Sequence, residues 1–151
     1  MTTNARWCTV IAAFAAATVV AACTGDSSQS TEDPRPAAPV AAGGPIAPDA
    51  GGKVIIVEME TQPDGSNVYE PAHIEARRGD VIRYMLVAGV HNTNFVADSN
   101  PGKPGLPPAT PLLQLPGQTY DVKVTLAPGT YYFHCDPHAL LGMKGTVTIL
   151  P

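Results

Sequence analysis

Alternation of apolar and polar side chains limits the C-terminal part of this chain to β-strands. Residues 120–126 are apolar at every second position, which is the period-2 pattern of a half-buried strand. The pair Pro128-Gly129 predicts a turn, and the alternation resumes over residues 131–135, where it places Cys135 on the same face as two aromatic side chains. An amphipathic helix needs a different period, so this part of the chain is expected to form a sheet.

Further strands are predicted at residues 54–59, 74–77, 81–87 and 145–150, with a turn at Gly79-Asp80. No stretch shows helical periodicity. About eight short strands separated by turn signals predict an all-β fold, an antiparallel sandwich or barrel. The sequence therefore places a folded domain at residues 53–151.

The N-terminal 22 residues have the pattern of a secretory signal peptide. Residues 10–22 are apolar apart from Thr18, and this run is shorter than the roughly 20 residues that a membrane-spanning helix needs. It ends in Val20-Ala21-Ala22-Cys23, which resembles the lipobox of bacterial lipoproteins, where the cysteine is lipidated and becomes the first residue. The alternative is an ordinary signal peptide that leaves Cys23 as a free thiol.

Residues 23–52 are predicted to be a disordered linker that starts at the lipidated Cys23. They are rich in Pro, Gly and Ser and contain no aromatic residue, so they cannot bury enough apolar surface to offset their ordering entropy. Such a segment suits a tether between a membrane and a domain. A disordered N-terminus without a function is the alternative.

Charge excludes one class of partner. The chain has 151 residues, with 9 Lys+Arg against 13 Asp+Glu and a formal net charge of −4. A protein that binds nucleic acid normally carries a basic surface, so no nucleic-acid partner is expected. The length allows one domain, and we expect a monomer.

Cys135 is the single cysteine of the predicted domain, since the other two of the 3 cysteines lie in the N-terminal segments. Exported domains normally use cysteines in pairs, so a lone thiol needs a chemical explanation. His138 and Met143 follow Cys135 at the spacing C-x2-H-x4-M, and His91 lies far upstream.

Two histidines, a thiolate and a thioether are the ligand set of a type 1 copper site. Thiolate and thioether prefer copper, whereas structural zinc sites use Cys and His. The competing chemistry is a nucleophilic cysteine with a histidine base, which leaves Met143 and the spacing unexplained. The predicted cofactor is therefore one copper ion, Cu(II)/Cu(I), with the ligands His91, Cys135, His138 and Met143.

Several stretches around these residues carry a family resemblance. An aromatic-Glu-Pro segment is found at Tyr69-Glu70-Pro71-Ala72 and is followed by the turn Gly79-Asp80. The first histidine is part of the pair His91-Asn92. The strand at residues 129–135 enters the ligand loop, and Gly142-Met143-Lys144-Gly145 forms its exit. Over residues 66–150 the chain resembles the cupredoxins, blue copper proteins of the plastocyanin and pseudoazurin type. The resemblance implies a cupredoxin-like Greek-key sandwich or barrel of eight strands, and an electron carrier rather than an enzyme.

The resemblance also assigns roles around the metal. It implies that Asn92 hydrogen-bonds between the two ligand loops. Pro137 has no N–H and cannot donate a hydrogen bond to the thiolate. Asp136 departs from the small residue common at this position, and its charge next to Cys135 favours Cu(II); a turn residue that points into solvent is the alternative.

An apolar surface for redox partners is implied next to His138. In the family an apolar patch surrounds the exposed edge of this histidine, and here Leu140 and Leu141 follow it; core packing is the alternative for these leucines. His134 precedes Cys135, as in amicyanin, and is expected on the outer face, at the partner surface or on a second electron path. A second copper would need more histidines than the 4 in this chain, and His73 is expected to be an ordinary surface residue.

Two functions use the same four ligands. The first is a type 1 blue copper protein that carries single electrons between transient redox partners outside the cytoplasm. The second is a copper-handling lipoprotein that delivers or buffers copper. The closed ligand set favours the carrier, since a copper chaperone normally exposes its metal. Either protein is expected in the periplasm or at the cell surface, anchored to a membrane through its N-terminal lipid.

Overall fold

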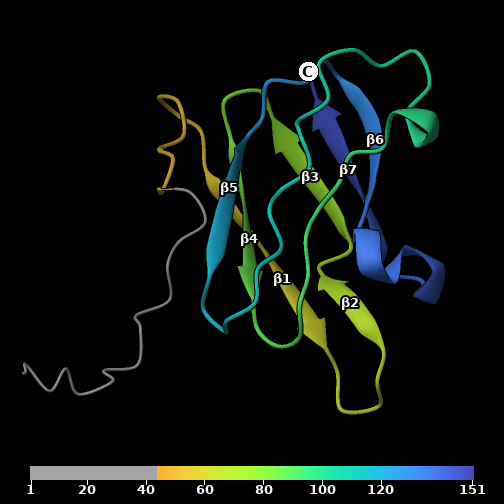
Figure 1. The fold of residues 1–151 in the computed structure, drawn as a ribbon. Coiled ribbons are helices and arrows are strands. Elements are labelled where there is room, and N and C mark those ends of the chain that lie inside the picture. Colours follow the sequence, from red (N-terminus) through yellow and green to blue (C-terminus); the bar gives the residue numbers. More distant parts are fainter. Residues whose placement is uncertain (1–43) are drawn as a thin grey trace, which may run out of the picture. The chain divides into compact units, whose positions relative to one another are not determined.

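The computed structural model describes residues 44–151 (Figure 1). The predicted signal peptide, the lipidated Cys23 and most of the predicted linker lie outside the described residues. In the described part of the chain, no helix has the length and apolar character required to cross a bilayer.

Seven strands form two sheets (Figure 1). The first sheet has the order β2-β1-β4-β5 and the second has the order β3-β7-β6. The strands are β1 (Val54–Thr61), β2 (Asn67–Glu70), β3 (His73–Arg77), β4 (Val81–Leu86), β5 (Thr119–Lys123), β6 (Gly129–His134) and β7 (Lys144–Leu150). The predicted all-β fold is confirmed, with seven strands in the described residues rather than about eight.

Two pairings differ from the expected antiparallel arrangement. Strand β1 pairs with β4 in parallel, and β3 pairs with β7 in parallel. The chain leaves the first sheet to form β3 and then returns to form β4. This crossing between the sheets allows β1 and β4 to run in the same direction, which the alternation of side chains cannot predict.

The core lies between the two sheets and follows the predicted alternation. On β6 and just beyond it, Tyr131, Phe133 and Cys135 are buried, while Tyr132 and His134 on the other face are partly exposed. Edge-to-face contacts connect the rings of Tyr69, Tyr84 and Phe133, with centroids 5.0–6.3 Å apart. The strand that enters the ligand loop is therefore fixed by the aromatic core.

Residues 87–118 connect β4 to β5 without forming a strand of either sheet. Isolated bridges pair His91 with Leu113 and Asn94 with His134. The buried Asn100 side chain accepts a hydrogen bond from Tyr132 N–H (2.8 Å) and donates one to Tyr132 O (2.9 Å). Asn100 thus satisfies backbone groups at the free edge of β6, which gives residues 100–116 an anchor that the sequence did not reveal.

Residues 44–52, which the sequence assigns to the linker, hydrogen-bond to the domain. Ile46 N–H donates to Asp121 Oδ2 (2.7 Å), and Asp49 N–H donates to Gly79 O (2.8 Å). Contacts of the domain thus begin upstream of the predicted boundary at Lys53. The composition did not predict this contact because it depends on backbone groups rather than on apolar burial.

Replacement of Tyr84 by Phe tests the polar balance of the core. The Tyr84 hydroxyl is fully buried and has no hydrogen-bond partner among the described residues. Removing it abolishes a desolvation penalty, so Tyr84→Phe should raise the free energy of unfolding by about 1 kcal/mol in chemical denaturation. Tyr69→Phe is the matched control, because the Tyr69 hydroxyl donates to Asn92 O (2.6 Å) and its loss should lower stability by about 1–3 kcal/mol. Equal destabilisation by both changes would contradict this account.

Candidate metal centre

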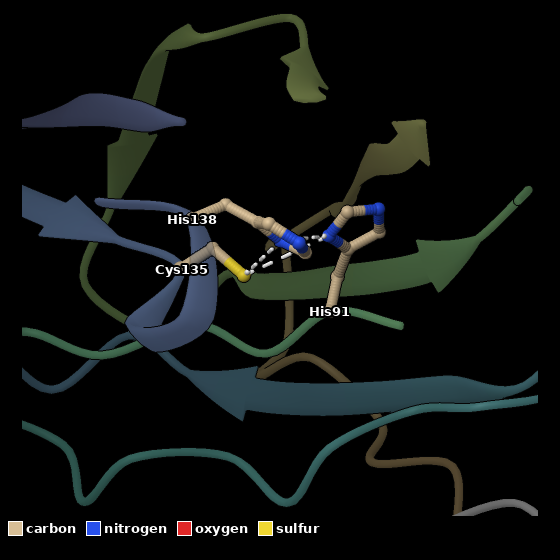
Figure 2. Close-up of side chains that lie close together, drawn as sticks. All are labelled: His91, Cys135 and His138. Carbon is tan, nitrogen blue, oxygen red and sulfur yellow. Dashed lines mark hydrogen bonds between the residues drawn. The ribbon is translucent and has the colours of Figure 1, made fainter. Parts of the chain in front are cut away.

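Three side chains from two loops converge at one end of the sandwich (Figure 2). His91 comes from the connection after β4, Cys135 follows β6, and His138 lies in the 3-10 helix η2 (Asp136–Leu141). Cys135 Sγ is 3.6 Å from His91 Nδ1 and 3.4 Å from His138 Nδ1, and the two Nδ1 atoms are 3.1 Å apart. These three atoms are metal-ligating atoms, and they lie close enough together to bind a single metal ion.

Backbone hydrogen bonds close the loop that carries Cys135 and His138. Cys135 N–H donates to Met143 O, and Met143 N–H donates to His138 O, both at 3.1 Å. Pro137 lies in the first turn of the 3-10 helix, and Gly142 caps its C-terminal end with φ of 94°, a conformation that favours glycine. These bonds hold the fully buried Met143 next to the other sequence-predicted residues.

Burial shifts the pKa values of His91 and Cys135. Desolvation, together with the nearby His138, lowers the pKa of His91 to about 4, so its imidazole is neutral near pH 7. Desolvation also raises the pKa of the Cys135 thiol, although backbone N–H groups of Asn92 and His138 act in the opposite direction. A nucleophilic cysteine needs a lowered pKa, so the surroundings of Cys135 do not activate its thiol as a nucleophile.

The side chain of Asn92 joins the two loops. Its Oδ1 accepts a hydrogen bond from Asp136 N–H (2.8 Å), and its Nδ2 donates to Asp136 Oδ2 (2.7 Å). Asn92 is buried, whereas the Asp136 side chain is 45% exposed, so the two bonds connect the interior to the surface. This is the position that the family resemblance implies for Asn92, between the loop of His91 and the loop of Cys135.

Asp136 has three side-chain hydrogen-bond partners, although its side chain is 45% exposed, so a role in capping the turn alone does not account for its contacts. Besides Asn92, its carboxylate accepts from Asn94 Nδ2 (2.8 Å) and lies 3.2 Å from His134 Nε2. Desolvation acts to raise the pKa of Asp136, but these hydrogen bonds outweigh it and hold the pKa below its usual value. The sequence did not predict the role of Asn94, for which the Asn-Thr-Asn run after His91 is the only signal.

The remaining predicted residues lie outside the three-residue group. Leu140 and Leu141 are exposed, so core packing is wrong for both, and Val90 near His91 is also exposed. His134 lies on β6 beside Asp136, with Tyr132 Oη 3.4 Å from its Nδ1. His73 is an exposed residue on β3 whose Nδ1 is 2.9 Å from Thr146 Oγ1, as expected for a surface histidine.

A small β-sandwich with a largely buried His-Cys-His group is typical of one class of copper-binding metalloproteins. Residues 57–150 match the family model "Copper binding proteins, plastocyanin/azurin family". The chain belongs to this family. Its cofactor is copper, and the plastocyanin-like proteins of this family are electron carriers and not enzymes.

Individual relatives agree with the family match. Plastocyanin from Vicia faba is 40% identical over 91 residues, which cover 57% of this chain and 91% of that protein. Chloroplastic plastocyanin from Pisum sativum is 38% identical over 91 residues, but the match covers only 54% of its length. Among solved structures, a mutant fern plastocyanin has a TM-score of 0.52 at 30% identity, covering 63% of this chain and 99% of that one. A reduced amicyanin variant has a TM-score of 0.52 at 27% identity, covering 75% and 92%.

Asp136→Asn tests the electrostatic influence of this carboxylate. Loss of a negative charge beside Cys135 favours Cu(I), so the reduction potential should rise by roughly 25–100 mV at low ionic strength, and less at high salt. Redox titration at two salt concentrations measures the shift. Asp98→Asn is the control, since Asp98 lies in the 3-10 helix η1 (Ala97–Ser99), outside the site. A shift of Asp136→Asn that is downward, or no larger than that of the control, would reject the electrostatic role.

Proposed function

We propose that this protein is a type 1 blue copper protein that carries single electrons between redox partners outside the cytoplasm. A copper ion would be held by His91, Cys135 and His138, with the thioether of Met143 as the fourth proposed ligand. The observation that carries the proposal is the convergence of two Nδ1 atoms and one Sγ atom within 4.8 Å of one another. A thiolate and a thioether beside two imidazoles select copper over zinc.

Rigid placement of the ligands is what the fold contributes to electron transfer. When bound, the copper ion supplies the Cu(II)/Cu(I) couple. His91 is held by backbone hydrogen bonds to Leu113 (3.1 and 2.8 Å), and the loop from Cys135 to Met143 is closed by its own backbone bonds. Because neither loop is free to rearrange, the ligand atoms keep one geometry in both oxidation states, and little reorganisation accompanies the electron.

His138 provides the route to a partner. It is the partly exposed member of the group, whereas His91 and Cys135 are buried. The exposed side chains of Leu140 and Leu141 follow it in the chain, and together these residues form the proposed docking surface. A small apolar surface suits the brief, low-area encounters of redox proteins. His134 is proposed to lie beside this route, at the partner surface.

The buried ligands also favour the carrier over the copper-handling alternative. A protein that delivers copper must let its partner reach the metal, and two of the three grouped side chains are buried. The lipobox-like Cys23 and the Pro-, Gly- and Ser-rich stretch after it support a tethered monomer at a membrane surface. A tether would let the domain reach partners without leaving the membrane.

Substitution of Cys135 tests the proposed ligand set. The copper-loaded protein should bind one copper and be intensely blue when oxidised, because the thiolate transfers charge to the metal on excitation. Cys135→Ser should abolish the blue band in the visible spectrum. Met143→Gln is the matched comparison: it should keep the blue band and lower the reduction potential, because an oxygen donor favours Cu(II). A blue Cys135→Ser protein would overturn the assignment.

Substitution of Cys23 tests the location. If Cys23 carries the lipid, Cys23→Ser should move the full-length protein from the membrane fraction to the soluble extracytoplasmic fraction, with copper binding unchanged. Fractionation followed by immunoblotting measures this shift. Cys8→Ser is the control and should leave the distribution unchanged. A native protein that is already fully soluble would show that the lipobox reading is incorrect.

A further inference from the structure

A polar pair lies behind His91, on the side of the ring away from Cys135 and His138. His91 Nε2 is 3.1 Å from Thr61 Oγ1, and Thr61 Oγ1 is 2.7 Å from Asn67 Oδ1. Thr61 is the last residue of β1 and Asn67 the first residue of β2, and the two are direct partners in the sheet. Neither Thr61 nor Asn67 belongs to the predicted site. The role of the row formed by Asn67, Thr61 and His91 is therefore inferred from its hydrogen bonds.

Counting protons along this row fixes the state of His91. The Thr61 hydroxyl has one proton, and the Asn67 oxygen can only accept, so the hydroxyl donates to Asn67. The orientation of the Asn67 amide is consistent with this, because its Nδ2 donates to Gly65 O (3.4 Å). The hydroxyl then offers only a lone pair to His91, so Nε2 must carry the ring proton. The His91 ring also hydrogen-bonds to the backbone of Ala88, which is the second partner of the ring outside the ligand group. The other nitrogen, Nδ1, is left bare and faces Cys135 and His138.

We propose that Thr61 and Asn67 are positioning residues that hold His91 as the Nε2–H tautomer, with Nδ1 ready for copper before the metal arrives. A wrong tautomer would present an N–H to the metal and would have to lose or move its proton before coordination. The inference rests on the proposed copper site, since a fixed tautomer is useful only where Nδ1 is a ligand. Partners of this kind orient metal-binding histidines and typically change metal affinity by about 10–100-fold.

A glycine beside Thr61 leaves space for the hydrogen bond between Thr61 Oγ1 and His91 Nε2. Gly89 has φ of 90°, and a Cβ added there would lie 2.3 Å from Thr61 Oγ1 and 2.7 Å from His91 Nε2. Any larger residue would therefore occupy the space of the hydrogen bond. Thr61 N–H also donates to Ala88 O (3.0 Å), which ties the end of β1 to the loop that carries His91. Burial of His91 and Asn67 shields the row from competing water.

The tautomer can be read directly in the metal-free, full-length protein. Long-range 1H–15N correlation spectra of the histidine rings at pH 7 distinguish Nε2–H from Nδ1–H. The native protein should show His91 as the Nε2–H form alone. Thr61→Val removes the side-chain acceptor with little change in shape and leaves the backbone of Ala88 as the ring's remaining partner. This variant should produce a detectable Nδ1–H population and an about tenfold weaker Kd for Cu(I). Thr61→Ser keeps the hydroxyl and should restore both the native tautomer and the native affinity.

Asn67→Leu gives an independent arm. Without its acceptor, the Thr61 hydroxyl is free to donate to Nε2, so this variant should also shift His91 toward Nδ1–H even if Thr61→Val does not fold. The inference is overturned if His91 stays Nε2–H in the folded variants, or if Thr61→Ser behaves like Thr61→Val. Failure of the proposed function looks different, because the native protein would then show the Nε2–H tautomer without a blue copper spectrum.

Discussion

Two hydrogen bonds between Asn92 and Asp136 hold the candidate metal centre together, because its side chains come from loops that belong to different sheets. His91 follows β4 of the first sheet, whereas Cys135 and His138 follow β6 of the second. Packing of the sheets brings these loops near each other but does not set their separation to tenths of an ångström. The paired bonds of 2.7 and 2.8 Å, made by a buried amide, supply that precision.

Asp136 extends this connection beyond one pair. Its carboxylate also accepts a hydrogen bond from Asn94 and lies within hydrogen-bond distance of His134. A single negative group thus connects the loop of His91, the loop of Cys135 and the end of β6. A small residue at this position could not make these bonds. The charge that holds the loops together also lies beside Cys135, so the contact that stabilises the site also influences the Cu(II)/Cu(I) equilibrium.

Local patterns in the sequence predicted the strands and the candidate ligands, because both depend on short-range spacing. The alternation over residues 131–135 placed Cys135 on the buried face, and the C-x2-H-x4-M spacing placed three candidate ligands in one loop. Contacts between distant segments could not be predicted in this way. The parallel pairing of β1 with β4, the bonds of Ile46 to Asp121 and the row from Asn67 through Thr61 to His91 all join residues whose proximity depends on the complete fold.

The central claim is that the chain holds the proposed ligands in one geometry whatever the oxidation state of the copper. X-ray absorption spectra of the copper-loaded protein, recorded oxidised and then reduced, measure this most directly. The account predicts two short Cu–N distances and one short Cu–S distance in both spectra, with only small changes between them. Loss of a nitrogen ligand on reduction, or an oxidised site without a short Cu–S distance, would contradict it.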